Sequence, residues 1–200
     1  MLVDSDKGCF VTNYHVIDGG QKTLVLLDQE TQMEARVIKS NEQTDLAVLK
    51  LVDDSDIALL KDYNEIKLRL TAAKGERVTA VGIPKAADLG FETKITAGVI
   101  SSHSFLEDPT MYGIDAAITT GSSGGGLYDE NGFLIGITAA GFRPDLNTEN
   151  VNGAVKGIHV NEIVSQTPCS LGLAPQKEVF SAVSIAQQSS TQVFPILVHK

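Results

Sequence analysis

Short apolar runs, rich in Val, Ile, Leu and Thr, alternate with polar turn residues along almost the whole chain. Turn signals such as Asp18-Gly19-Gly20 and Lys74-Gly75 stand between these runs. Many short runs at close spacing are typical of the strands of an all-β sandwich or barrel. We therefore predict strands at residues 8–13, 23–27, 34–40, 46–51, 66–72, 77–83, 93–102, 113–118, 133–140 and 154–160.

Other features punctuate this rhythm. Asn131-Gly132 stands between two apolar runs and predicts a tight β-hairpin. A helical pattern is confined to residues 160–166 and 176–188. From Thr167 onward Ser and Gln become common. This last part is either a mobile tail or a terminal element packed on the main body.

Composition and charge narrow the function classes. The 200 residues, 42% hydrophobic and 20% charged, suit one globular domain or two small subdomains. A net charge of −9 disfavours a nucleic-acid partner, because a phosphate backbone needs a basic face. No run approaches the roughly 18 apolar residues of a membrane span. The first ten residues, MLVDSDKGCF, do not form a signal peptide, so the compartment stays open.

Cys9 and Cys169 lie far apart, and neither has a second Cys or a His at ligand spacing. Two cysteines are too few for a disulfide framework. We therefore predict two free thiols, with a single bridge as the alternative, and Cys9 as a small buried hydrophobe. We expect no metal site and no cofactor.

Three residue types that acyl-transfer chemistry needs together occur along the chain. His15 follows an apolar run in VTNYHVI, Asp45 precedes one in QTDLAVLKL, and Ser123 lies in GSSGGG between two apolar segments. Taken singly, each is typical of a packed histidine, a turn aspartate or a loop. Taken together, they supply a nucleophile, its base and the carboxylate that orients the base. The glycines let successive N–H groups converge on a developing oxyanion.

The motifs that carry these residues resemble the chymotrypsin-fold serine proteases, and most closely the HtrA/Deg branch. VTNYHVI is similar to that family's Thr-Asn-x-His-Val motif, and TDLAVLKL to its Asp-Leu-Ala-Val-Leu-Lys segment. TKITAGVISS resembles a strand that usually reads Thr-x-Gly-Ile-Ile-Ser, and GIDAAITTGSSGGGLYDENGFLIGI resembles the nucleophile region. The resemblance covers roughly residues 8–163.

The resemblance implies a role for each candidate residue. His15 would be the general base, Asp45 its orienting carboxylate and Ser123 the nucleophile. Aligning Gly-x-Ser-Gly-Gly places Ser122 where the family has Asn or Asp, which selects Ser123. The backbone N–H groups of Gly121 and Ser123 would form the oxyanion hole. The activity implied is that of a serine endopeptidase that works through an acyl-enzyme.

The resemblance also assigns substrate contacts. Ala117 would lie at the base of the pocket for the P1 residue, and Thr138, Ala139 and Ala140 would pair with an extended substrate by β-augmentation. None of these residues is acidic. We therefore expect a small or aliphatic P1 residue, rather than Lys or Arg, in unfolded or extended protein and peptide substrates.

The fold implied is all-β, with two packed antiparallel barrels. Residues 1–166 would be the protease domain, with approximately 1–72 in the first barrel and 73–166 in the second. Residues 167–200 would be a C-terminal tail of unknown role. We expect no PDZ domain within this chain. The family resemblance further implies a periplasmic or cell-envelope location and a homotrimer.

The chain departs from the family pattern at several positions. Ser122 and Gly126, where the family has Asn or Asp and Pro, predict a looser oxyanion loop. The family usually has one more strand before the run that begins here at Leu2-Val3, so we expect the first barrel to lack a strand. Either the chain is a fragment, or upstream residues are missing, or the tail after Thr167 fills the gap.

Two alternative functions remain to be weighed. The first is a catalytically inactive, protease-like binding or scaffold module, which usually lacks a triad member, whereas all three are present here. The second is a lipase or esterase. It is disfavoured because the chain order is His, Asp, Ser and the G-x-S-x-G elbow is missing.

Overall fold

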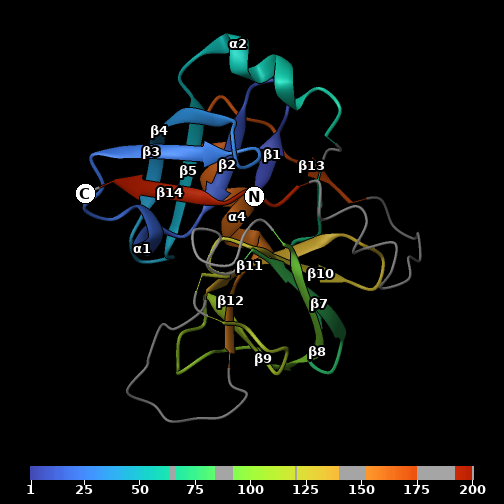
Figure 1. Ribbon diagram of the computed structural model, residues 1–200. Helices are drawn as coiled ribbons and strands as arrows, with labels where there is room; N and C mark the ends of the chain where they lie inside the picture. Colours follow the sequence, from blue (N-terminus) through green and yellow to red (C-terminus); the bar gives the residue numbers. More distant parts are fainter. Residues whose placement is uncertain (64–65, 84–91, 120, 140–151, 175–191, 200) are drawn as a thin grey trace.

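The strands form two sheets, one in each half of the molecule (Figure 1). The computed structural model describes residues 1–63, 66–83, 92–119, 121–139, 152–174 and 192–199. The two-barrel, mostly β architecture that the sequence predicts is confirmed. The predicted residue boundaries of the barrels and of the tail stay predictions.

The first sheet is antiparallel and six-stranded, in the order β1-β2-β5-β4-β3-β14. Its strands are β1 (Leu2–Asp4), β2 (Cys9–Thr12), β3 (Lys22–Leu26), β4 (Gln32–Asn41), β5 (Leu46–Leu51) and β14 (Ile196–His199). The two ends of this sheet approach each other, since Leu2 N donates to Gln192 O, 2.9 Å away and four residues before β14.

The second sheet closes into a six-stranded antiparallel barrel, because β10 pairs with both β7 and β11. The barrel strands are β7 (Arg77–Gly82), β8 (Lys94–Ser102), β9 (Met111–Ile114), β12 (Asn152–Lys156), β11 (Leu134–Ala139) and β10 (Gly126–Asp129). Two short parallel strands, β6 (Lys67–Leu68) and β13 (Gly172–Leu173), extend the sheet beyond β11. The hairpin predicted at Asn131-Gly132 joins β10 and β11.

Helices in the described residues are few and short. They are α1 (Tyr14–Ile17), α2 (Asp54–Ile57), the 3₁₀ turn η1 (Ala58–Leu60) and α4 (Gly157–Ser165). None of the helices in the described ranges is both long and apolar enough to cross a membrane. The helix predicted at 160–166 is present as α4, but it starts earlier, at Gly157. The helix predicted at 176–188 lies outside the described residues.

The main core lies between the two barrels. Alternate residues of a strand face opposite sides, and in β5 this places Leu49 inside the first barrel and Val48 in the layer between the barrels. Burial on both faces explains why β5 reads as a continuous apolar run. Helix α4 covers the same layer with Val160, Ile163 and Val164, whose spacing puts them on one face of a helix.

Several predicted strands are shorter than expected. The run 66–72 contributes only Lys67–Leu68, and the run 113–118 leaves the sheet after Ile114. The run 154–160 becomes helical at Gly157, because Val160 is then buried together with the rest of the α4 face. Periodicity does not distinguish a buried strand from a buried helix in so short a run.

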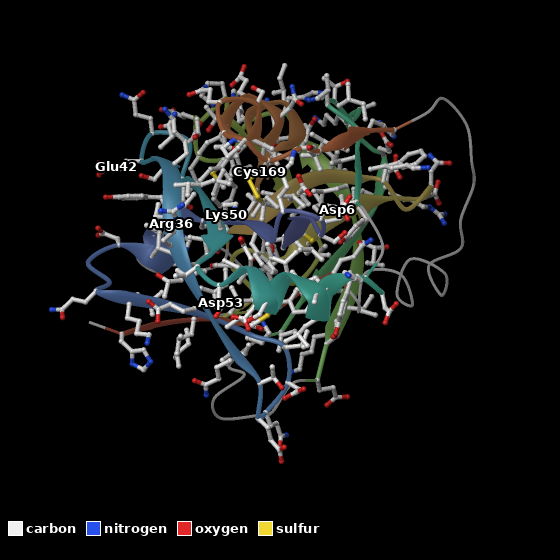
Figure 2. The ribbon with its side chains drawn as sticks, turned by 90° about the horizontal axis from the view of Figure 1, so that it is seen from above. Asp6, Arg36, Glu42, Lys50, Asp53 and Cys169 are labelled. Carbon is white, nitrogen blue, oxygen red and sulfur yellow. A yellow bond between two sulfur atoms is a disulfide. The ribbon has the colours of Figure 1, made fainter. Side chains whose placement is uncertain are left out.

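The prediction of two free thiols is wrong. Cys9 and Cys169 form a disulfide that spans 160 residues of sequence, with their Cα atoms 6.1 Å apart. Figure 2 shows Cys169 beneath the helix α4, in the interior of the molecule. The number of cysteines could not reveal this bond, because the two sulfurs meet only when the residues after α4 pack against β2.

The tail supplies a strand of the first barrel. β14 pairs with β3 in antiparallel register, from Ile196 opposite Val25 to His199 opposite Lys22. The tail thus supplies the strand beside β3, as one of the options that the sequence left open predicts, and the other two options stay predictions. Phe194 lies in the same core as the first-barrel strands, and its ring contacts Phe10 edge-on.

Candidate active site

His15 is positioned by a one-turn helix that follows β2 directly. Asn13 occupies the N-cap position of α1, but its side chain makes no capping bond there. Asp45 caps the helix instead, since its Oδ1 accepts from the backbone N–H of His15 at 2.9 Å. The carboxylate that caps the helix is thus the one that meets the imidazole.

The His15 ring and Asp45 form the central pair of the site. His15 Nδ1 lies 2.8 Å from Asp45 Oδ2, and the two side chains are 40% and 8% exposed. An ionised carboxylate only accepts hydrogen bonds, so Nδ1 carries the proton and Nε2 is left as a basic nitrogen. The buried carboxylate and the exposed ring suit a base that is held from behind and faces solvent.

The backbone of Asp45 is in the left-handed region, with φ 50°. Few non-glycine residues adopt this conformation, and Asp is among those that tolerate it best. Two hydrogen bonds hold it: Asp45 N donates to Glu42 O, and Asp45 O accepts from Asn13 Nδ2 at 3.1 Å. Backbone outliers of this kind cluster at functional sites.

Asn13 connects this pair to the serine loop. Its side chain is fully buried, and its Oδ1 accepts from the backbone N–H of Gly124 at 2.7 Å. Gly124 directly follows Ser123, which is half-buried. One amide therefore ties the loop of Asp45 to the loop of Ser123. Asn13 lies within the VTNYHVI motif, but the motif alone predicts no role for its side chain.

The serine loop turns sharply at two glycines. Gly121 and Gly124 have φ 92° and φ 82°, a region that side chains rarely adopt. A Cβ at Gly124 would also lie 2.5 Å from Thr12 Oγ1. GSSGGG is therefore a constrained turn, in which the glycines allow the serine loop to pack against β2.

Ser122 and Gly126, the two departures from the family pattern, are both held by hydrogen bonds to neighbouring segments. Ser122 N donates to Thr119 O, and Ser122 O accepts from Gly125 N and from the hydroxyl of Thr138. Gly126 belongs to β10 and pairs with a strand on each side. Hydrogen bonds from neighbouring strands thus hold the loop where the family's longer polar residue and proline are missing.

The expected substrate residues lie at the end of β11 and on the segment after β9. Ala117 is exposed, and its carbonyl accepts from Thr96 Oγ1 at 2.7 Å. The preceding carbonyl, of Ala116, accepts from Asn152 Nδ2 at 2.9 Å. Thr96 and Asn152 were not singled out from the sequence, because they act from other strands and carry no local motif.

Thr138 and Ala139 differ in the backbone hydrogen bonds that they make. Both of its backbone groups are bonded within the serine loop: Thr138 N donates to Gly125 O, and Thr138 O accepts from Gly124 N. Thr138 thus supports the loop on which Ser123 lies. Ala139 ends β11 opposite Gly153, and Ala140 lies outside the described residues.

Comparison with known proteins identifies the family. The sequence profile of the trypsin-like peptidase domain matches residues 1–137. The chain belongs to the trypsin-like peptidase family. The expected membership of the trypsin-like peptidases is therefore confirmed. The His15–Asp45 pair lies within the matched region, as does the serine loop.

Individual relatives of this trypsin-like domain are serine endoproteases. The chain is 32% identical over 166 residues to "Probable periplasmic serine endoprotease DegP-like" of Bartonella henselae, covering 81% of this chain and 31% of the relative. It is 29% identical to "Periplasmic serine endoprotease DegP" of Escherichia coli K12, covering 83% and 34%. The chain thus spans about a third of the length of these relatives.

A solved structure supports the same relationship. The serine endoprotease from Yersinia pestis superposes with a TM-score of 0.63 at 30% identity, covering 82% of this chain and 54% of that one. The fold expected from the sequence resemblance is therefore shared with a relative of known structure.

Proposed function

We propose that this chain is a serine endopeptidase that uses His15, Asp45 and Ser123. The observation that carries the proposal is the 2.8 Å bond between His15 Nδ1 and Asp45 Oδ2. Asn13 ties this pair to the residue after Ser123, and the chain belongs to a peptidase family.

The proposed reaction proceeds through an acyl-enzyme. Ser123 Oγ attacks the peptide carbonyl carbon while His15 Nε2 takes the hydroxyl proton. The N–H groups of Gly121 and Ser123 stabilise the tetrahedral oxyanion. The C–N bond then breaks as His15 returns the proton to the leaving amine. Water attacks the acyl-enzyme with His15 again as base, which releases the acid and restores Ser123.

Labelling with a fluorophosphonate probe tests the nucleophile. The native chain should be labelled, and Ser123→Ala should abolish labelling, because the probe reacts with an activated serine. Ser122→Ala is the matched control, since it removes the neighbouring hydroxyl, and it should still be labelled. Labelling that persists in Ser123→Ala would refute the assignment. Absence of labelling in the native chain would favour the inactive scaffold.

We further propose a small or aliphatic P1 preference. Ala117 offers no charge, and the nearby carboxylate of Asp115 accepts from the Val99 N–H at 2.5 Å. The end of β11 at Ala139 would pair with the substrate backbone. Cleavage of a peptide library should therefore occur mainly after small or aliphatic residues. A majority of sites after Lys or Arg would contradict this preference.

An oxidising compartment such as the periplasm is the proposed location. The relatives named above are periplasmic by name, and the Cys9–Cys169 bond is of a kind that persists in oxidising compartments. Cell fractionation of the natural host would test this. The trimer implied by the family resemblance also stays a proposal, for which sedimentation of the purified chain is the measurement.

A further inference from the structure

The C-terminal strand lies against the helix that carries His15. Figure 1 shows β14 beside β3, with its C-terminal end next to α1. Gly20, just after α1, packs so closely on Val198 that a Cβ at position 20 would lie 2.1 Å from Val198 Cγ1. Gln21 N donates to His199 O at 2.7 Å. The turn that ends α1 is therefore held by the last residues of β14.

Helix α1 needs such support because it is a single turn. Isolated helices of this length are unstable, since nucleation costs more than one turn returns. Asp45 fixes the start of the helix. At its end Ile17 O accepts from Gly20 N at 3.1 Å, and the Ile17 side chain lies in the same core as Val198. The exposed His15 ring is thus positioned through the two ends of its helix.

β14 itself is anchored in the first barrel. Phe194, 7% exposed, stacks edge-on against Phe10 at 5.6 Å and Tyr63 at 5.1 Å. Pro195 O accepts from Leu26 N. The strand therefore transmits a fixed position from the barrel core to the end of α1.

We propose that the C-terminal end of β14, where it contacts Gly20 and Gln21, is a positioning element for His15, with Val198 as the positioning residue. This rests on the proposed function, in which His15 is the general base. The contact between Gly20 and Val198 lies in the first barrel, whereas the expected substrate-binding residues Ala117 and Ala139 lie in the second. Loss of the contact should therefore lower kcat and leave KM unchanged.

A double-mutant cycle between Gly20 and Val198 tests the contact. Gly20→Ala adds a methyl group that collides with Val198, and Val198→Ala makes room for it. We expect Gly20→Ala to reduce kcat by roughly 10- to 100-fold, because small misplacements of a catalytic group are costly. Val198→Ala alone should reduce kcat less, by about tenfold. The double variant should recover toward Val198→Ala.

Two matched variants separate positioning from stability. Ile196→Ala trims the same core-facing side of β14 but pairs with Val25, away from α1. Leu197→Ala alters the residue between them. All variants are compared at a temperature where circular dichroism shows them fully folded. We expect both controls to keep the native kcat. A double variant no more active than Gly20→Ala, or an equal loss of kcat in Ile196→Ala and Val198→Ala, would overturn the proposal.

Hydrogen exchange of the α1 amides gives a readout that does not depend on catalysis. Val198→Ala should speed the exchange of the amides of Ile17 and Gly20, and Ile196→Ala should not. Unchanged exchange in Val198→Ala would refute the contact even if the protein is an active peptidase. Faster exchange in a chain that no fluorophosphonate labels would instead support the contact and count against the proposed function.

Discussion

A single buried amide, that of Asn13, joins all three segments of the candidate triad. It lies two residues before His15, donates to the carbonyl of Asp45 and accepts from the amide that follows Ser123. Because both groups of the side chain are used and no solvent reaches it, Asn13 fixes the spacing between the loops. The role is one of positioning, since both of these bonds go to backbone groups.

Replacing Asn13 by Ala should reduce both stability and reactivity. The Asp45 carbonyl would lose its partner, whereas the Gly124 N–H keeps a second bond to Thr138 O. We expect a loss of about 1–3 kcal/mol in the free energy of unfolding, as for one unsatisfied buried group. Fluorophosphonate labelling of the folded protein should slow roughly 10- to 100-fold.

The matched control for this prediction is Asn131→Ala. Asn131 lies in the β10–β11 hairpin, where its amide bonds to Asp129. Urea unfolding should show a smaller loss for it, and labelling should proceed at the native rate. If Asn13→Ala is labelled as fast as the native chain while fully folded, Asn13 has no positioning role.

Single residues of the site differ in how far the sequence reveals their roles. The contact between His15 and Asp45 could be anticipated, because each residue lies in a local motif, while their catalytic roles stay predictions. The role of Asn13 could not be anticipated, because it depends on Gly124, 111 residues away. The importance of Gly124 was predicted only in part. Its need for a left-handed backbone follows from the turn, but its contact with Thr12 is visible only in the folded chain.

Among the elements, the β10–β11 hairpin is built around a buried carboxylate. Asp129 is fully buried, and its Oδ1 accepts from the N–H groups of Asn131 and Phe133. Arg69 Nη1 lies 2.6 Å from Asp129 Oδ2 and bridges to Glu76 as well. The Asn-Gly signal predicted the turn, but this ionic support comes from elements that no local pattern links.

Glu76 should make stability depend on pH. Burial acts to raise the pKa of Glu76, but hydrogen bonds from Arg69 and the Ala73 N–H outweigh it and hold the pKa below its ordinary value of 4.5. Because the pKa is lower in the folded state, the stabilisation is complete above pH 4.5 and is lost as the pH falls through the lowered pKa. Thermal unfolding between pH 7 and pH 3 should show this loss.

Glu76→Gln should flatten that part of the profile. The variant should be less stable than the native chain at pH 7, by about 1–2 kcal/mol, because a charged hydrogen-bond partner is removed. The difference should shrink as the pH falls below 4.5. Glu130→Gln is the control, since Glu130 is exposed and its ion pair with Arg77 is long, at 4.0 Å. A native-like pH profile in Glu76→Gln would contradict the assignment.

For the molecule as a whole, the sequence did not predict the contacts that join distant parts of the chain. The strand pattern predicted an all-β sandwich or barrel, because apolar runs mark the buried strands, whereas the two packed barrels followed from the family resemblance alone. Neither the pairing of β14 with β3 nor the bond between Cys9 and Cys169 leaves such a mark. Both join parts of the chain that lie far apart in sequence, so they follow from the folded shape and not from any segment.

The disulfide should therefore contribute to global stability more than to activity. It closes a loop of 160 residues, and cross-links of long loops typically stabilise by about 2–4 kcal/mol. Other bonds hold the same ends, since Ser170 N donates to Asp4 Oδ2 and Lys7 Nζ donates to Ser170 Oγ.

Reduction by dithiothreitol should lower Tm by several degrees while the folded protein keeps its kcat. The double variant Cys9→Ala/Cys169→Ala should have the lower Tm with or without dithiothreitol, which controls for other effects of the reductant. A native Tm that dithiothreitol leaves unchanged, under conditions where thiol titration shows full reduction, would show that the bond adds no stability.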